Sequence, residues 1–367
     1  MEFVQQCGKT GLQASLIRGL GSERDEAERD LLEAGVPLPL LHRAAWAASL
    51  SHWEPWFLLL RDAGGRACGG VAIEKVAMRA MPGHVLLRVR RFGGGLPDEI
   101  CRGALEALAS LAKNVPRVLR LQVNVLSRDR LEAIGKTLEE LRFQQVRPPS
   151  SYTHTLIVDL KPTEDEIFKS FSTNARRRIR ETMKHSVKSL VLTDPIYAER
   201  LAELQQAAFQ RTRGDIGSED WQGILKISSE FPNLSRIGGL FDGDDTSPEK
   251  MDAFLWICNH GDHWEYRAAG SARRTDVKIP FGYQLAWDMI RWAKASGADW
   301  FDMGGVTLAE DGESALEGIS RFKRYFSRQV AEVGAEWILE PSPVRARIAN
   351  AISSSAHRWL NLRKKQR

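Results

Sequence analysis

A carboxylate and two glycines follow an apolar run in the last third of the chain. The run ADWFDMGG ends in Asp302, Met303, Gly304 and Gly305, where a buried strand is expected to pass into a turn. In mixed α/β sheets, ligands bind outside the carboxyl ends of the strands. Asp302 could therefore orient an incoming amine or accept its proton, and Gly305 would let a substrate approach the backbone closely. The alternative is that Asp302 caps the turn through its own backbone and that the glycines serve the turn alone.

Two basic clusters offer contacts for phosphate. One lies in NARRRIRETMKHSVK, where Arg176, Arg177 and Arg180 fan around a predicted helix. The other runs from Pro341 to the end of the chain and holds seven Lys or Arg and no acid. Such clusters can meet phosphate in RNA or in lipid headgroups. The alternative for each cluster is a solvated helix face.

Metal and disulfide chemistry are not expected. The four cysteines lie far apart without a CxxC pair, and the histidines His154, His260 and His263 lack the spacing of metal ligands. We therefore predict no metal site and interpret the three histidines as structural.

Length and composition indicate a soluble globular protein of two domains. The chain has 367 residues, of which 43% are hydrophobic and 27% charged, too many apolar residues for a disordered chain. No apolar run approaches the roughly 20 residues that span a bilayer. The opening MEFVQQCGKTG lacks the basic start and apolar core of a secretory signal. The expected compartment is the cytoplasm.

The elements that would position these groups occur twice in the same order. In the first half, PWFLLL, ACGGVAIEKVA and VLLRVRRF are predicted strands, followed by the helix EICRGALEALASLAK with Asp98 as N-cap and the strand VPRVLRLQVNV. In the second half, RIGGLF, AFLWIC and HWEYRAAG are predicted strands. Pro280 then opens the helix FGYQLAWDMIRWAKAS, Gly297 closes it, and ADWFDMGG follows. A helix between strands implies a parallel crossover in each half, so we predict a mixed α/β fold.

The join between the halves is placed near Pro162, because VRPPSSYTHTLIVDLKP has Pro and Ser residues around a single strand. We predict a first domain over residues 1–161, a second over 162–341, and a basic amphipathic C-terminal helix over 342–367.

The second domain begins with a well-marked helix. Thr163 and Glu166 have the spacing of a capping box. Four apolar residues are expected to continue one stripe along this helix: Phe168, Phe171, Ala175 and Ile179.

Four segments of the second half then occur in a recognisable order. They are the helix FSTNARRRIRETMKHSV, a hairpin ending in YRAAGSA, a Pro before QLAWDMIRWAKASGADWFDMGG, and GISRFKRYFS. This set resembles the FemABX family and its GNAT-type relatives, well over residues 160–340 and mainly in topology over 1–158. The resemblance implies a tandem pair of GNAT-like domains that transfers an amino acid from aminoacyl-tRNA to an amine on a peptidoglycan precursor. Other relatives are associated with acyl-CoA or with reactions outside cell-wall synthesis.

The resemblance also implies a catalytic role for Lys323. In SRFKRYF this lysine matches the Phe-Lys pair near the end of family members, so its ammonium would lie near the acceptor site and stabilise negative charge or a phosphate. Asp302 is the second predicted catalytic residue, and Phe322 is expected in the core. The alternative for Lys323 is a surface lysine, since Arg321 and Arg324 beside it are equally basic.

The segment after HWEYRAAG takes the place of the CoA-binding loop of GNAT enzymes. That loop has the pattern Arg/Gln-x-x-Gly-x-Gly/Ala and cradles the pyrophosphate of CoA, whereas SARRTDVKIPFGYQ lacks the glycine pair. Basic side chains at the start of a helix remain candidate phosphate contacts. The predicted substrate-binding residues are Tyr266, Arg267, Ser271, Arg273, Arg274, Lys278, Gly304, Gly305, Arg176, Arg177 and Arg180.

A candidate nucleotide site lies in the first half. Arg90, Gly93 and Gly95 of RRFGGGLPDE match the spacing of the CoA loop directly before a helix. An ordinary glycine turn is the alternative.

The C-terminal tail places Val344, Ile348, Ile352 and Trp359 on one helical stripe with basic neighbours. It could lie on an anionic membrane surface, touch tRNA phosphates or pack against the body of the protein. Packing through the apolar stripe is the interpretation that we favour.

These observations together predict an aminoacyltransferase that joins an amino acid from aminoacyl-tRNA to a peptidoglycan precursor or a small amine, without a cofactor beyond its co-substrate. The first alternative is an N-acyltransferase that uses acyl-CoA as co-substrate. The second is a protein without activity that binds RNA or a membrane through its basic clusters. The expected location is the cytoplasm, with peripheral contact at the inner face of the membrane through the C-terminal helix.

Overall fold

The computed structural model describes residues 4–8, 10–49, 53–78, 81–212, 219–272, 280–307, 317–349 and 351–352. Its contacts divide the chain into two compact units: unit 1, with residues 1–37, 41–151 and 334–367, and unit 2, with residues 38–40 and 152–333. The division at Tyr152 precedes the expected join near Pro162, because the strand between these two residues pairs within unit 2.

Unit 1 is built on an eight-stranded sheet in the order β1-β2-β3-β4-β5-β6-β15-β7. The strands are β1 (Val4–Gln6), β2 (Gln13–Arg18), β3 (Glu54–Arg61), β4 (Ala67–Ala77), β5 (Val85–Phe92), β6 (Val118–Leu126), β7 (Gln144–Gln145) and β15 (Gly334–Leu339). The helices are α1 (Ser22–Glu33), α2 (Ala44–Ala48), α3 (Asp98–Asn114) and α4 (Leu131–Glu140). β5 and β6 run parallel, as the predicted crossover requires.

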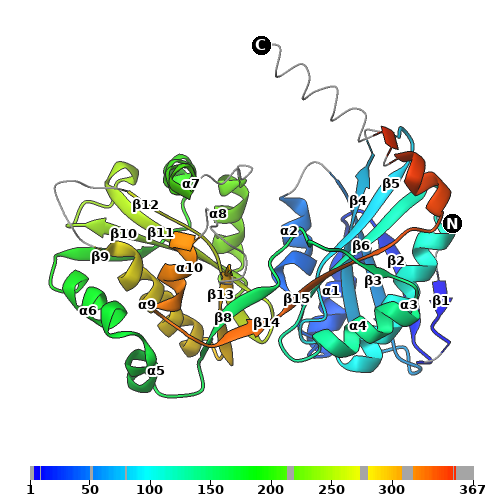
Figure 1. Ribbon diagram of the computed structural model, residues 1–367, viewed down its shortest axis with the longest axis horizontal. Helices are drawn as coiled ribbons and strands as arrows, with labels where there is room; N and C mark the ends of the chain where they lie inside the picture. The colour runs from blue at the N-terminus through cyan, green and yellow to red at the C-terminus, as the bar shows by residue number, and fades with distance from the viewer. Residues whose placement is uncertain are drawn as a thin grey trace, which may run out of the picture. The chain divides into compact units, whose positions relative to one another are not determined.

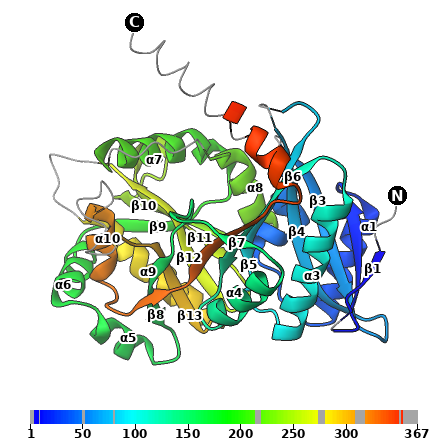
Figure 2. The ribbon, with the colours of Figure 1, turned by 45° about the vertical axis from the view of Figure 1, so that its right-hand side comes forward.

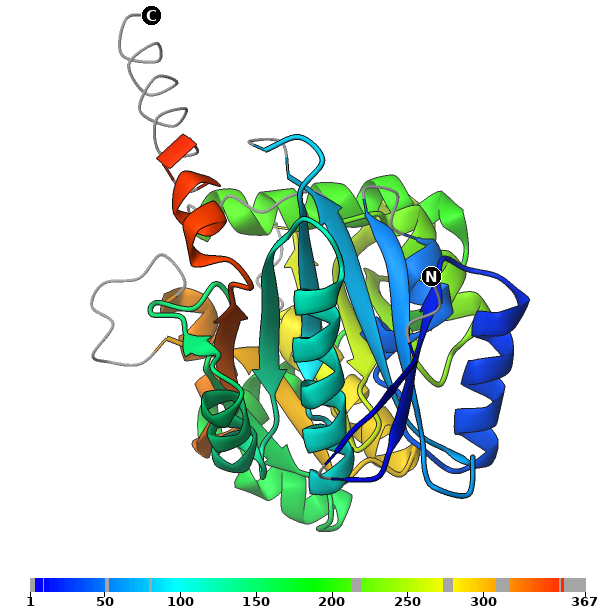
Figure 3. The same ribbon diagram turned by 90° about the vertical axis from the view of Figure 1, so that its right-hand side faces the viewer.

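Helix α3 covers one face of this sheet and completes its core. It packs against β2, β3, β4 and β6 (Figure 3). Along β5 and β6, the side chains of Leu87, Val89 and Val123 point to this face and are fully buried, as expected where alternate residues share one face of a strand. The predicted helix is confirmed, although Pro97 rather than Asp98 occupies the N-cap position.

Unit 2 repeats this design around a seven-stranded sheet in the order β14-β8-β13-β12-β11-β10-β9. The strands are β8 (His154–Asp159), β9 (Val187–Val191), β10 (Ser235–Asp242), β11 (Met251–Asn259), β12 (His263–Ser271), β13 (Trp300–Gly305) and β14 (Val330–Glu332). The helices are α5 (Glu164–Ser170), α6 (Thr173–Thr182), α7 (Ala198–Thr212), α8 (Trp221–Glu230), α9 (Phe281–Ala295) and α10 (Glu317–Arg324). β12 and β13 are parallel and are joined through α9, so the second predicted crossover is confirmed.

Both faces of the unit 2 sheet are covered by helices (Figures 1 and 2). On one face, Leu255 of β11 belongs to the same buried cluster as Leu285 and Ile290 of α9. On the other face, the ring of Trp221 in α8 lies 5.0 Å from the ring of Phe254, the next residue along β11. The strand is therefore buried on both sides, which explains its nearly continuous apolar sequence.

One strand in each unit comes from a distant part of the sequence. β8 follows unit 1 in the chain but pairs with β13 and β14 of unit 2. β15 follows unit 2 but lies between β6 and β7 of unit 1. This arrangement was not predicted, and it brings the segment around Tyr152 and Thr155 to the end of β13.

The helix predicted from the capping box has two parts. The box is confirmed, because the Thr163 side chain accepts from the Glu166 amide and the Glu166 carboxylate accepts from the Thr163 amide. The prediction of one continuous helix is wrong, since α5 ends at Ser170 and α6 begins at Thr173 with Ser172 as its N-cap. The predicted apolar stripe nevertheless lies in or against the buried core of the unit.

The C-terminal segment forms a short helix over residues 343–349. Its small residues Ala346 and Ala349 are buried, whereas Val344, Ile348 and Ile352 are 67%, 50% and 43% exposed. Packing through the apolar stripe is therefore wrong for these three residues, and Trp359 lies outside the described residues. Among the described residues, no helix has the length and apolar character to cross a membrane.

Candidate active site

A pocket of about 420 Å³ lies within unit 2 beside the carboxyl end of β13. Its walls come from β11, β12, β13, α7, α9 and α10 and from the segment before β8. The lining is mostly apolar and includes a smaller set of polar side chains. The residues that matter most for its chemistry are Tyr152, Glu265, Tyr266, Arg267, Gly304, Gly305 and Lys323.

Lys323, which was predicted as a catalytic residue, lines this pocket and carries a positive charge into it. It lies on α10 with only 6% of its surface exposed, and its Nζ donates a hydrogen bond of 2.9 Å to the Gly305 carbonyl. Burial lowers the pKa of the Lys323 ammonium from 10.5 to about 8, while the nearby Asp302 and Glu265 act to raise it. The group is therefore charged at neutral pH and can stabilise negative charge that develops in the pocket. The surface-lysine alternative is excluded by this burial.

Gly304 and Gly305 leave room for the side chains of Lys323 and Tyr152 beside the end of β13. Gly304 has a φ of +73°, and a Cβ at this position would lie 2.7 Å from the Tyr266 carbonyl oxygen and 3.2 Å from the Lys323 Nζ. A Cβ at Gly305 would lie 2.6 Å from the Cβ of Tyr152. Both positions are thus restricted by close approach as well as by the turn.

Asp302 is fully buried and does not line the pocket. Its Oδ1 accepts hydrogen bonds from the Thr155 hydroxyl and from the Gly304 amide, and its Oδ2 lies 3.2 Å from the Tyr152 hydroxyl. The bond from the Gly304 amide is the turn-capping contact that the sequence offered as an alternative. From this place Asp302 can act on the pocket only through its neighbours.

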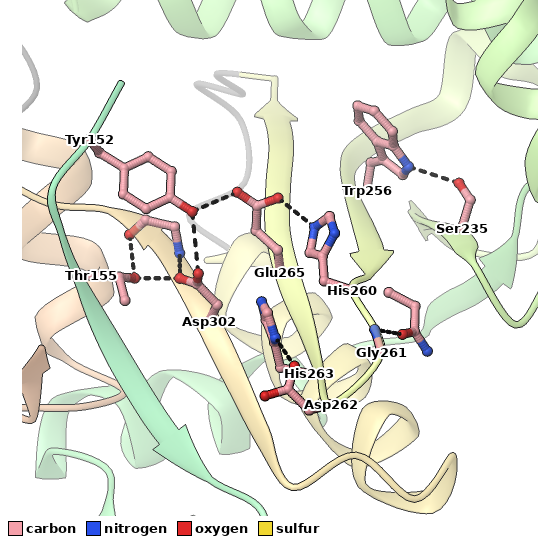
Figure 4. Close-up of polar contacts among 12 residues, drawn as sticks. Tyr152, Thr155, Ser235, Trp256, His260, Gly261, Asp262, His263, Glu265 and Asp302 are labelled. Atoms are coloured by element: carbon pink, nitrogen blue, oxygen red, sulfur yellow. Dashed lines mark hydrogen bonds and ion pairs between the residues drawn. The ribbon is translucent and has the colours of Figure 1, made fainter. Parts of the chain in front are cut away.

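A second buried carboxylate lies beside Asp302 and was missed by the sequence reasoning. Glu265 is 1% exposed, lines the pocket and is the register partner of Asp302 across the parallel pair of β12 and β13. Its Oε1 accepts a hydrogen bond of 2.9 Å from the Tyr152 hydroxyl, and its Oε2 lies 3.1 Å from Nε2 of His260. Figure 4 shows the Tyr152 phenol contacting both carboxylates. One signal was available in the sequence, since HWEYRAAG carries a carboxylate within a strand expected to be buried.

A neighbouring pair, Asp262 and His263, is structural. His263 Nδ1 lies 2.7 Å from Asp262 Oδ1, and the His263 ring stacks on Trp300 with 3.9 Å between centroids. Burial acts to raise the pKa of Asp262, but the bonds from His263 and Trp300 outweigh it and hold this pKa well below the ordinary value. Neither residue lines the pocket.

Three of the predicted substrate-binding residues lie on β12 and line the pocket: Tyr266, Arg267 and Ser271. Burial raises the pKa of the Tyr266 phenol, so Tyr266 stays neutral and offers a hydroxyl. Three further predicted residues, Arg273, Arg274 and Lys278, lie outside the described residues.

The predicted basic residues of α6 do not line the pocket. Arg177 pairs with Glu181 one turn along the helix at 2.5 Å. The Arg176 guanidinium donates to the Thr173 hydroxyl, and that of Arg180 lies 5.3 Å from the ring centroid of Phe168. Arg177 and Arg180 are exposed and Arg176 is half-buried.

The candidate nucleotide site of unit 1 has a packing explanation. Arg90 pairs with Glu74 through a contact of 2.7 Å between its Nε and Oε1. Gly93 and Gly95 both have positive φ. A Cβ at Gly93 would lie 2.4 Å from the Ile134 side chain, and a Cβ at Gly95 would lie 2.8 Å from the Pro37 side chain. The glycines therefore satisfy the turn between β5 and α3.

The described residues contain no group of three or more His, Cys, Asp or Glu side chains arranged to hold a metal ion.

The fold and this pocket define a tandem GNAT-like protein, and comparison with known proteins supports this class. Residues 250–354, which contain Glu265, Asp302 and Lys323, match the model of the FemAB family. A search of the curated proteins gave no match.

Two solved structures share the fold over nearly the whole chain. A structure of FemX superposes with a TM-score of 0.70 at 14% identity and covers 90% of this chain and 99% of that one. L-PGS from Bacillus licheniformis superposes with a TM-score of 0.53 at 15% identity and covers 91% of this chain and 98% of that one. The resemblance to the FemABX family, which the family model matches over residues 250–354, and the tandem GNAT-like fold are thereby confirmed.

Proposed function

We propose that this chain transfers an amino acid from aminoacyl-tRNA to an amine, on a peptidoglycan precursor or a small molecule, and forms a peptide bond. The observation that carries the proposal is the buried Lys323 ammonium beside the Gly304–Gly305 turn, in a pocket open to a substrate. When an amine attacks an ester carbonyl, negative charge develops on the carbonyl oxygen. A fixed cation in a largely apolar pocket stabilises that charge more strongly than the same cation would in water.

An aminoacyl donor suits the pocket better than a CoA thioester. The pocket has space for a side chain between apolar walls that include Phe254, Leu285 and Phe322. The sequence between β12 and α9 lacks the glycine pair with which GNAT enzymes cradle the CoA pyrophosphate. The exposed arginines Arg177 and Arg180 of α6 are candidate contacts for tRNA phosphates.

The remaining predicted residues take supporting roles in this proposal. Tyr266, Arg267 and Ser271 line the pocket and would bind substrate. Asp302 would position the Tyr152 hydroxyl and the Gly304 backbone rather than contact the substrate. The C-terminal helix would hold the protein at the inner face of the membrane through its exposed apolar stripe.

The test is a transfer assay with purified protein, a panel of charged tRNAs, a panel of acyl-CoAs, and both a peptidoglycan precursor and small amines as acceptors. Mass detection should find an acceptor that gains one aminoacyl group with a charged tRNA and gains nothing with acetyl-CoA. Product formed from acetyl-CoA alone, and lost on Arg90→Ala, would replace the proposal by the CoA-dependent reaction. Tight, salt-sensitive RNA binding without transfer from any donor would replace it by a binding function.

A further inference from the structure

A line of buried hydrogen bonds leads from the pocket wall into the body of unit 2. Tyr152 and Glu265 line the pocket, and His260, behind them, is 1% exposed. The Tyr152 hydroxyl lies 2.9 Å from Glu265 Oε1, and Glu265 Oε2 lies 3.1 Å from His260 Nε2 (Figure 4). Both oxygens of the Glu265 carboxylate are therefore held in place, and its position on the wall is fixed.

The Tyr152 hydroxyl also contacts a second carboxylate, at 3.2 Å from Asp302 Oδ2. A phenol has one hydrogen and can donate it to one carboxylate at a time. While Glu265 is ionised, the shorter contact favours donation to Glu265. Once Glu265 has gained a proton, the phenol can rotate its hydrogen toward Asp302. The Asp302 carboxylate then accepts the hydrogen bond that Glu265 accepted before. The cluster can thus take up one proton without leaving a buried polar group without a partner.

We propose that Glu265 is the catalytic residue that takes the proton lost by the acceptor amine, and that Tyr152 and His260 are positioning residues that hold it. The proposal rests on the proposed function, since it needs an amine that attacks a carbonyl in this pocket. Glu265 is suited to the role because, among the described residues that line the pocket, it is the buried carboxylate, whereas Asp302 lies behind the wall.

The proton balance of the reaction closes within the pocket. The amine nitrogen forms a bond to the carbonyl carbon, and the bond from that carbon to the ester oxygen of the donor breaks. The amine gives one proton to the Glu265 carboxylate, and the Lys323 ammonium gives one proton to the departing oxygen. Transfer of the Glu265 proton to the neutral Lys323 then restores both groups, and no proton is gained or lost overall.

Lys323 is not the proton acceptor in this scheme. Asp302 and Glu265 lie near enough to favour its charged form electrostatically, and its Nζ donates to the Gly305 carbonyl. An ammonium cannot accept a proton, so the lysine serves as donor to the leaving oxygen. In the described part of the chain, the titratable groups that face Glu265 include Lys323 from α10, Asp302 from β13 and Tyr152 from the segment before β8. His260 from the turn before β12 and Cys258, the register partner of Glu265 on β11, face it as well.

The kinetic test is Glu265→Gln, which keeps the size of the side chain and its ability to accept from Tyr152. We expect kcat to fall by about 100-fold or more, the scale of general base catalysis, with the KM for the acceptor changed less than about threefold. The wild-type kcat should rise with pH as Glu265 loses its proton, and this rise should disappear in the variant. Retention of kcat within about threefold, or a loss confined to KM, would overturn the proposal.

Two further variants separate positioning from general stability. Tyr152→Phe removes the donor to the ionised carboxylate, so the rise of kcat with pH should move to higher pH. Asp262→Asn is the matched control, because it removes a partly exposed carboxylate from a neighbouring histidine, and neither of these two residues lines the pocket. It should lower thermal stability and leave the pH profile of kcat unchanged. If the pH profile of kcat is the same in Tyr152→Phe as in the wild type, Tyr152 does not position the Glu265 carboxylate.

An infrared measurement tests the proposal without any substrate. The difference spectrum between wild type and Glu265→Gln should show an ionised carboxylate at pH 7.5, because a proton acceptor must be ionised at the working pH. A protonated carboxyl at that pH would overturn the proposal even if the donor were still unidentified. A different result would contradict the proposed function itself: the wild-type protein would transfer no amino acid from any charged tRNA.

Discussion

Glu265 and Asp302 are register partners on the parallel strands β12 and β13, and both contact the hydroxyl of Tyr152. The relationship depends on two features of the fold. The crossover through α9 sets the two strands side by side with their carboxyl ends together. The pairing of β8 with β13 then places Tyr152, which precedes β8 in the chain, against both carboxylates. Two buried carboxylates on adjacent strands repel each other, so their coexistence requires donors such as Tyr152, Thr155 and His260.

The first prediction concerns the activity of Lys323→Met. The substitution keeps the length and apolar stem of the side chain and removes the cation that faces the developing oxyanion. We expect kcat to fall by roughly 100-fold or more, as for the loss of one oxyanion donor elsewhere. The measurement is steady-state transfer with the donor identified by the panel assay.

Arg321→Met is the matched control for this prediction, because Arg321 lies on the same helix but is exposed and does not line the pocket. Its kcat should stay within about twofold of wild type. If both variants lose activity equally, the effect of Lys323→Met comes from the charge of the helix and not from the pocket.

The second prediction follows from the pKa of Lys323, which burial lowers to about 8 in the folded protein from an ordinary 10.5. Between these two pH values the unfolded chain binds the proton and the folded chain does not, so folding becomes more favourable as the pH rises. Below pH 8 both states hold the proton, and the cost of burying the charge is fully present. Relative to Lys323→Met, the wild-type free energy of unfolding should therefore increase by about 1.6 kcal/mol from pH 8 to pH 9.5.

Urea unfolding of the two proteins at several pH values measures this difference, and titrations common to both proteins cancel. A difference that stays constant between pH 8 and pH 9.5 would show that Lys323 keeps its ordinary pKa in the folded protein. The electrostatic basis of its proposed role would then be lost.

The third prediction concerns the space between β13 and Lys323. Gly304→Ala places a methyl group 2.7 Å from the Tyr266 carbonyl oxygen and 3.2 Å from the Lys323 Nζ, at a φ of +73°. Gly297→Ala imposes a similar φ of +84° with nothing within 4 Å of the new methyl group. The second variant should cost about 1–2 kcal/mol of stability for the left-handed backbone alone. Gly304→Ala should cost about 1–3 kcal/mol more because of overpacking.

Chemical unfolding of these two variants isolates the steric contribution. Gly304→Ala should also reduce transfer activity, since the displaced group is either backbone beside the pocket or the lysine itself. Equal stability losses in the two variants would mean that Gly304 serves only the turn.

Much of the scaffold could be predicted because it depends on local pattern. Strand and helix order, the two crossovers and the capping box of Thr163 are all determined by residues close in sequence. The Asp302 and Gly304–Gly305 segment and Lys323 were predicted as site residues for the same reason, or from the family resemblance. Gly304, Gly305 and Lys323 line the pocket, whereas Asp302 lies behind its wall.

The acidic part of the site could not be predicted, because it depends on pairing between distant segments. Tyr152 lies 113 residues before Glu265 in sequence, and its place depends on which unit β8 joins. The same applies to β15, where Glu336 accepts a hydrogen bond from Gln122, 214 residues away. The break between α5 and α6 was missed for another reason. The apolar stripe continues across it, so only Ser172, a good N-cap residue, marked the new helix start.

The last prediction concerns the C-terminal helix, whose apolar residues Val344, Ile348 and Ile352 are exposed while Ala346 and Ala349 are buried. Arg345 and Arg347 beside this stripe are exposed as well. Exposed apolar side chains flanked by arginines favour an anionic lipid surface. Replacement of the three apolar residues by Ser should therefore weaken sedimentation with anionic vesicles by about tenfold or more, and leave binding to neutral vesicles unchanged. Because the three side chains are not buried, the melting temperature should stay within about 2 °C of wild type. A marked fall in melting temperature with unchanged vesicle binding would instead show that the stripe packs against protein in solution.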